Sequence, residues 1–155
     1  MDEAWINTYI YRERAKWLRW ERVYWRISGR RYSRKSIIAW RNFRNKLIAT
    51  MVFDWTANTD LVVNWVKDML LPSLEPSSII IFDNASFHKS IKIREIIESN
   101  WHILLFLPPY SPDLNPIEHK WNELKQRLRK SFDTSLSFVE NLISKLNDMS
   151  ELIMV

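Results

Sequence analysis

SIIIFDNASFHKSIKIREIIESNWHILLFLPPYSPDLNPIEHKW, residues 78–121, contains the most informative pattern in the sequence. It opens with a short apolar run, Ile79–Phe82, that stops at Asp83-Asn84, and this predicts a strand buried on both faces. A second apolar run, His102–Leu107, predicts another strand. The residues between the two runs carry isoleucines at helical spacing, namely Ile93, Ile96 and Ile97. A strand, a helix and a strand in this order predict a parallel crossover unit.

Acidic residues lie where this unit is expected to bind ligands, because such sites lie beyond the carboxyl ends of the strands. Asp83 ends the first strand, and a proline-rich loop, 108–112, follows the second. After the loop, Asn115 at the N-cap, Pro116 at N1 and Glu118 at N3 predict a helix start. Asp83 and Glu118, with 34 residues between them, are therefore expected to meet. Close carboxylates repel unless a proton or cation intervenes, and their oxygens suit Mg²⁺ or Mn²⁺.

Each of these acids also has a purely structural interpretation. In that interpretation, Asp83 does no more than close an Asx turn at a strand end. Likewise, Glu118 does no more than complete a capping box. The sequence motifs that surround both residues, at 83–90 and 107–121, favour the site interpretation.

Two motifs carry a family resemblance: DNASFHKS at 83–90 and LPPYSPDLNPIEHKW at 107–121. They closely resemble the catalytic core of DDE transposases, in the bacterial insertion-sequence branch related to mariner elements. The resemblance extends from Asp2 to about Lys130. It implies an α/β fold of the ribonuclease-H-like type, a mixed sheet flanked by helices, for residues 1–130.

The resemblance also implies a site and a reaction. Asp2, Asp83 and Glu118 would be both the catalytic acids and the metal ligands, holding Mg²⁺ or Mn²⁺, with two ions expected. One ion would activate the water that attacks a DNA phosphodiester, and the other would stabilise the leaving 3′ oxygen. The freed 3′-hydroxyl would then join target DNA. Asn84, His88 and Asn115 are expected beside the three acids.

The N-terminal residues, Met1 to Ile6, read as the back half of a strand, so the first strand is expected to be truncated. In the resembled family the first catalytic acid is the Asp of an Asp-Glu pair, which places it at Asp2. Glu3 is a competing candidate, but alternation along a strand points it to the opposite face. A helix-turn-helix part is expected upstream, either separate or missing.

The hairpin and helices outside this stretch follow from periodicity. Strands are predicted at 36–40 and 46–53 as a hairpin, with a strand edge at 22–25 and a turn at 28–30. A helix is predicted from Asn58 to Pro72. Residues 131–155 are expected to add an amphipathic helix, packed on the domain or on a partner, with an apolar face of Leu136, Val139, Leu142, Leu146 and Met149.

Positive charge is concentrated in one segment, although the net charge is only +5. Residues 12–46 contain 13 Lys or Arg against two acids, and aromatic residues are interleaved with them. This composition favours a surface for double-stranded DNA, although a solvated basic face with inward aromatics is the alternative. The expected DNA contacts are Arg30, Arg31, Arg34, Lys35, Tyr110 and Lys125.

Composition limits the remaining classes. With 155 residues the chain has the length of one domain, and its lack of cysteine excludes disulfides and thiolate metal sites. Its single glycine argues against a Gly-rich phosphate loop, and no apolar run reaches membrane-spanning length. We expect a cytoplasmic, nucleoid-associated transposase domain that forms a homo-oligomer on DNA. The alternatives are an inactive remnant that binds DNA or interferes with the intact enzyme, and a stand-alone nuclease of the same fold.

Overall fold

The computed structural model describes residues 1–7, 34–109, 111–150 and 153–154. One sheet has the strand order β1-β2-β3-β6. Its strands are β1 (Asp2–Asn7), β2 (Arg34–Arg41), β3 (Leu47–Phe53) and β6 (Ile153–Met154). The pairs β1–β2 and β2–β3 are antiparallel, so the predicted hairpin is confirmed, and β6 runs parallel to β3. The strand edge at 22–25 and the turn at 28–30 lie outside the described residues.

The predicted crossover unit is confirmed. The strands β4 (Ile79–Phe82) and β5 (Ile103–Phe106) are parallel, and α2 (Ile91–Ser99) connects them. They form a two-stranded sheet of their own rather than continuing the first. Met1 links the two sheets, since its amino group donates a hydrogen bond of 2.7 Å to the carbonyl of Ile81.

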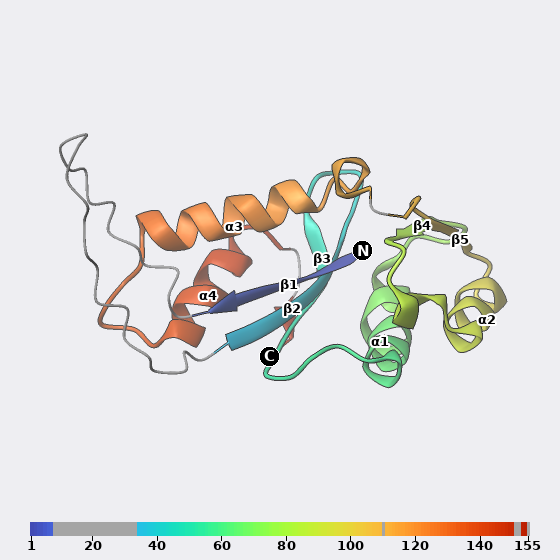
Figure 1. Cartoon of the computed structure of the whole chain (residues 1–155), viewed down its shortest axis with the longest axis horizontal. Coiled ribbons are helices and arrows are strands. Elements are labelled where there is room, and N and C mark those ends of the chain that lie inside the picture. The colour runs from blue at the N-terminus through green and yellow to red at the C-terminus, as the bar shows by residue number, and fades with distance from the viewer. Residues whose placement is uncertain (8–33, 110, 151–152, 155) are drawn as a thin grey trace.

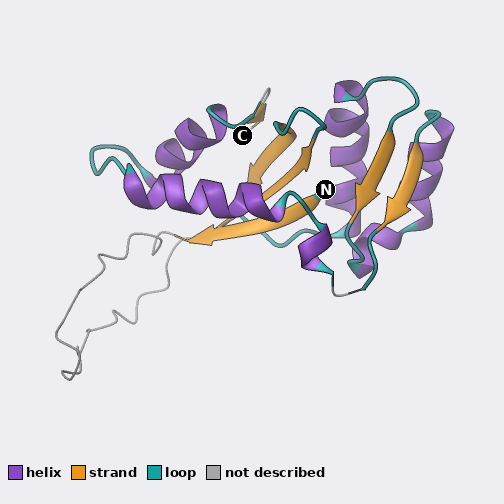
Figure 2. Ribbon diagram, turned by 90° about the horizontal axis from the view of Figure 1, so that it is seen from above, coloured by secondary structure: helices purple, strands orange, loops and turns teal. Residues whose placement is uncertain are grey.

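The prediction that β4 is buried on both faces is wrong. Ile80 and Phe82 are fully buried, but Ile79 and Ile81 are 54% and 43% exposed. The reason is the placement of the helices. The buried face packs with α1 (Thr59–Trp65) and α2, whereas α3 (Glu118–Lys130) and α4 (Phe138–Asn147) cover the other sheet (Figures 1 and 2).

A shared core nevertheless joins the two sheets. One hydrophobic cluster contains side chains from the first sheet, from β4 and β5, and from α1 and α2. Within it, the indole N–H of the buried Trp65 donates a 2.6 Å hydrogen bond to the carbonyl of Ala49, which ties α1 to β3. The chain from Asn58 begins α1 as predicted, because the Asn58 side chain accepts from the Leu61 amide. It continues through a π-helical turn, Val66–Leu70, and a 3₁₀ turn, Leu71–Ser73.

A second cluster lies between the opposite face of the first sheet and helices α3 and α4. Helix α3 contributes Trp121, Leu124 and Leu128, and α4 contributes Leu142 and Leu146. The capping box of Ser137 and Glu140 begins α4. The predicted apolar residue Leu136 precedes this helix and is exposed.

The predicted cap at Asn115 is wrong. Helix α3 begins at Glu118, with Ile117 at the N-cap position and no side-chain cap hydrogen bond. A backbone hydrogen bond takes the place of the side-chain cap: the Glu118 amide donates to the Asn115 backbone carbonyl at 3.1 Å. In the described part of the chain, no helix is long and apolar enough to cross a membrane.

Candidate active site

Asp2 is held on the α3 side of β1. It is 7% exposed and lies on the same strand face as the buried Ala4 and Ile6, which pack with α3. The indole N–H of Trp121 donates to Asp2 Oδ2 at 3.3 Å, and the Glu3 amide donates to Asp2 Oδ1 at 2.8 Å. Strand alternation therefore places the first acid against the helix that carries Glu118.

Asp83 directly follows β4, and its carboxylate is fixed by the next turn. Its Oδ1 accepts a hydrogen bond of 3.2 Å from the Ala85 amide, which is the Asx turn considered as its structural role. The same oxygen also contacts Nδ1 of His88. Asp83 therefore closes the Asx turn and also lines the candidate site, and these local hydrogen bonds orient its carboxylate.

His88 stands behind Asp83 and is fully buried. It belongs to the 3₁₀ turn η4 (Ser86–Lys89). Its Nδ1 contacts Asp83, and its Nε2 lies 2.9 Å from Oε1 of Glu3. This imidazole thus joins β1 to the segment after β4.

The three predicted acids line one cleft of about 530 Å³. Asp2 comes from β1, Asp83 from the end of β4, and Glu118 from the first residue of α3. Two of the three predicted neighbours, Asn84 and Asn115, also line the cleft, whereas His88 does not. The remaining lining residues come from the loops, namely Ala85, Lys89, Leu107, Pro108, Pro109, Ser111 and Pro112. The structure therefore gathers residues that are more than 100 positions apart in the chain.

Burial and like charges shift the pKa values of the groups in and beside the cleft. Burial raises the pKa of Asp2, and the carboxylates of Asp83, Glu118 and Glu3 raise it further. Burial also raises the pKa of Asp83, but hydrogen bonds from His88 and Ala85 outweigh this and hold it below its ordinary value. For His88, burial lowers the pKa, yet the hydrogen bonds to Asp83 and Glu3 prevail and raise it to about 9. The resulting imidazolium offsets part of the negative charge.

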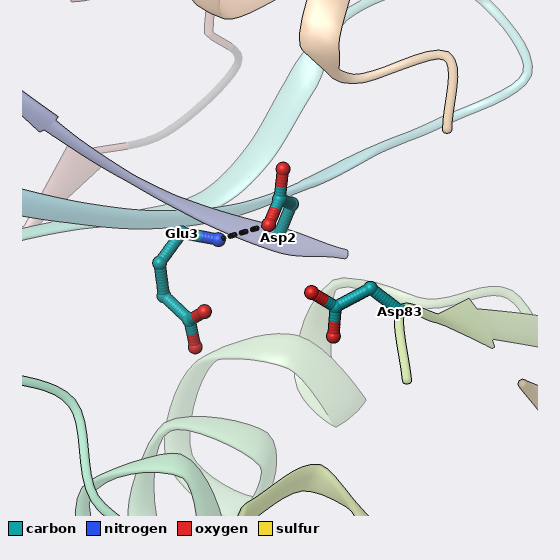
Figure 3. A group of neighbouring side chains, drawn as sticks. All are labelled: Asp2, Glu3 and Asp83. Carbon is teal, nitrogen blue, oxygen red and sulfur yellow. Dashed lines mark hydrogen bonds between the residues drawn. The ribbon is translucent and has the colours of Figure 1, made fainter. Parts of the chain in front are cut away.

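The donor set fits a hard divalent cation. Asp2, Glu3 and Asp83 each offer a carboxylate oxygen, and these atoms all lie within 4.8 Å of one another. Figure 3 shows Asp83 directed toward the start of β1, where the Asp2 and Glu3 side chains leave the strand on different sides. A cation among these oxygens would relieve the repulsion that raises the pKa of Asp2, and carboxylate oxygens are the ligands that Mg²⁺ prefers.

The predicted DNA contacts are dispersed. Arg34 is exposed at the start of β2, with its guanidinium 5.1 Å from the ring centroid of Trp5. Lys35 is already paired with Asp54 at 2.5 Å. Lys125 is partly buried on α3. Arg30, Arg31 and Tyr110 lie outside the described residues.

Three residues near the acids were missed or misread from sequence. Glu3 was set aside because it faces away from Asp2, but the turn after β4 brings His88 to that face. Trp121 was not predicted to be near the acids, but its indole N–H binds Asp2. Its position three residues after Glu118 was the available signal, since both then share one helix face. Lys89, in the DNASFHKS motif, lines the cleft and is exposed.

Comparison with known proteins agrees with this geometry. Residues 1–146 match the family described as DDE superfamily endonuclease. Two curated relatives come from nematodes. The Tc1 transposase of Caenorhabditis elegans is 48% identical over 46 residues, covering 30% of this chain and 17% of the relative. The Tcb1 transposase of Caenorhabditis briggsae is 31% identical over 101 residues, covering 61% of this chain and 36% of the relative.

Among solved structures, a chain of the Mos1 strand transfer complex matches with a TM-score of 0.71 at 20% identity, covering 94% of this chain and 44% of that one. This likeness shows a shared fold and confirms the expected ribonuclease-H-like α/β architecture. The chain spans less than half the length of these relatives. Since the family match covers nearly all of its residues, the chain belongs to the DDE superfamily of endonucleases.

Proposed function

We propose that this chain is the catalytic domain of a transposase, which cleaves DNA and joins the freed 3′ end to target DNA. The observation that carries the proposal is the convergence of Asp2, Asp83 and Glu118 on one cleft from three distant parts of the chain. Membership of the endonuclease family and similarity to two transposases support it.

The three acids, we propose, hold Mg²⁺ or Mn²⁺, with two ions in the active state. When bound, such ions would lower the pKa of an attacking water and stabilise the charge on the leaving oxygen. The protein's own part is to present charged carboxylates in a fixed arrangement. His88 keeps Asp83 ionised, and the Trp121 indole orients the Asp2 carboxylate.

The DNA would enter through the open side of the cleft. Lys89 lines it and is placed to contact a phosphate, and Arg34 and Lys125 add positive charge elsewhere on the surface. Arg30, Arg31 and Tyr110 complete the proposed DNA contacts. Because the matched segments cover only 36% of the Tcb1 transposase and 44% of the Mos1 chain, we propose that a separate helix-turn-helix part recognises the element ends, and that the enzyme acts as a homo-oligomer.

Nicking of supercoiled plasmid DNA tests this function. The wild-type chain with Mn²⁺ is expected to convert supercoiled to open-circular DNA, whereas Asp83→Asn should lose at least about 100-fold in rate, because the neutral amide lacks the charge needed to hold a divalent ion in the cleft. Asp68→Asn is the matched control, since Asp68 is exposed and lies away from the cleft. Equal nicking by wild type and Asp83→Asn, or nicking that persists in EDTA, would overturn the proposal.

A further inference from the structure

Three side chains form a continuous chain of contacts on the α1 side of the candidate site. Asp83 Oδ1 contacts Nδ1 of His88, and Nε2 of the same ring contacts Glu3 Oε1 at 2.9 Å. Glu3 and His88 are 85 positions apart in sequence. The contacts therefore fasten the beginning of β1 to the turn that follows β4.

The ring of His88 has little freedom apart from these two contacts. It is completely buried, and its edges pack against Phe82 and Phe87, with ring centroids 5.3 and 4.4 Å away. Its backbone is held as well, since the His88 amide donates to the Ala85 carbonyl at 3.1 Å. A buried ring held at both nitrogens transmits the position of one carboxylate to the other.

Glu3 is placed for this task by strand alternation. Its neighbour Asp2 faces α3, while the Glu3 side chain leaves β1 on a different side, toward η4 (Figure 3). At 17% side-chain exposure, Glu3 is largely shielded from water, so its hydrogen bond competes little with solvent. Asp2 therefore contacts helix α3, and the adjacent Glu3 contacts His88.

We propose that Glu3 is a positioning residue that acts through His88 to hold the Asp83 carboxylate in place for the metal. The inference rests on the proposed function, because it assigns a role within that site. Outer partners of metal ligands fix ligand orientation, and their loss costs about 10–100-fold in metal affinity. The rival roles are a direct metal ligand, because Glu3 lies within 4.8 Å of Asp2 and Asp83, and a purely structural contact.

Mn²⁺ titration of Glu3→Ala and Glu3→Gln separates these roles. Gln keeps an acceptor oxygen for His88 Nε2 but loses the charge that a direct ligand needs. Positioning predicts that Glu3→Ala weakens Mn²⁺ binding about 10-fold or more, while Glu3→Gln stays within about threefold of wild type. Equal losses in both variants, matching Asp83→Asn, would make Glu3 a ligand. Unchanged affinity in both, whatever their melting temperatures, would leave only a structural contact. Either result overturns the proposal.

A double-mutant cycle tests whether the effect passes through His88. His88→Asn keeps an amide donor near the place of Nδ1, facing Asp83, and removes the nitrogen that faces Glu3. In this background Glu3→Ala is expected to change Mn²⁺ affinity less than twofold, because the connection is already cut. A full additional loss would show that Glu3 acts independently of His88 and would contradict the proposal.

A metal-free measurement keeps this inference separate from the proposed function. In ¹⁵N-labelled apo protein, the two buried N–H groups of His88 should give slowly exchanging imidazole signals, assigned by their absence in His88→Asn. Glu3→Ala should shift or broaden the Nδ1–H signal at Asp83, whereas Glu3→Gln should retain it. If wild type and Asp83→Asn bind Mn²⁺ equally, the proposed function fails. An unaltered Nδ1–H signal in Glu3→Ala means that the positioning inference fails.

Discussion

The three candidate acids are held by different local arrangements, although they line the same cleft. Asp2 is buried and receives the indole N–H of Trp121. Asp83 receives a backbone amide and the His88 ring. Glu118 is the first residue of α3, with no side-chain cap hydrogen bond at that helix start. Its carboxylate makes no side-chain hydrogen bond within the described residues, which leaves it available to the cleft that it lines.

Glu118→Gln tests the role of this carboxylate at the residue scale. Gln preserves the size of the side chain but removes the charge, and it relieves repulsion with Asp2. The apo variant should be at least as stable as wild type, while DNA nicking should fall by about 100-fold or more. The measurement is a thermal melt with and without Mn²⁺, together with plasmid nicking.

Mn²⁺ at about 100 times its Kd should stabilise wild type by about 2.7 kcal/mol, and should stabilise Glu118→Gln much less. Glu98→Gln is the matched control, because Glu98 is an exposed helical acid on α2, paired with Arg94. An equal Mn²⁺ shift in wild type and Glu118→Gln, with nicking retained, would remove Glu118 from the metal site.

At the scale of elements, β4 and β5 show how helix placement decides burial. In both strands one residue of each alternating pair packs against α1 and α2, and the other is exposed. An apolar run in sequence does not distinguish a strand covered on both faces from one covered on a single face. The exposed residues of these strands are Ile79, Ile81, Ile103 and Leu105.

Two neighbouring leucines of β5 provide a matched test. Leu104 is 5% exposed, and Leu104→Ala should cost about 2–5 kcal/mol of unfolding free energy because it leaves a cavity in the core. Leu105 is 48% exposed, and Leu105→Ala should change stability by less than about 1 kcal/mol. Urea denaturation measures both values. Comparable losses at the two positions would show that the second face of this sheet is also covered in solution.

At the scale of the whole molecule, one core joins two sheets whose strands do not pair with each other in the described chain. The cluster that contains Ile38 of β2 also contains Ile80 of β4, with α1 residues such as Val62 beside them. The candidate site lies where these sheets meet, since Asp2 belongs to one sheet and Asp83 follows the other. Both sheets must therefore be folded before the acids can meet.

Ile38→Ala tests this cooperativity. Ile38 is fully buried, so its truncation should cost about 2–5 kcal/mol. If the sheets unfold together, hydrogen exchange at the Ile80 amide in β4 should accelerate by the same factor as at the Thr50 amide in β3. Protection that falls at Thr50 but is unchanged at Ile80 would show that the two sheets are separate folding units.

Local sequence patterns predicted the strands of the hairpin and of the crossover unit, the helices, and two of the acids with their spacing, but not the short strand β6 or the first residue of α3. The short apolar run that ends at Asp83 and the helix after the proline loop are both indicated by local sequence patterns. The family resemblance assigned the first acid to Asp2, and in the structure Asp2 lines the same cleft as Asp83 and Glu118.

Tertiary packing determines how these pieces meet. The contact of Glu3 with His88, the indole bond to Asp2 and the open face of β4 all depend on segments distant in sequence. Alternation along β1 predicts the face of the strand from which the Glu3 side chain projects, but it does not predict that His88 is its partner. The start of α3 was misassigned for a related reason, because a backbone bond replaced the side-chain cap that local sequence favours. Packing, which no local pattern encodes, selected the partners.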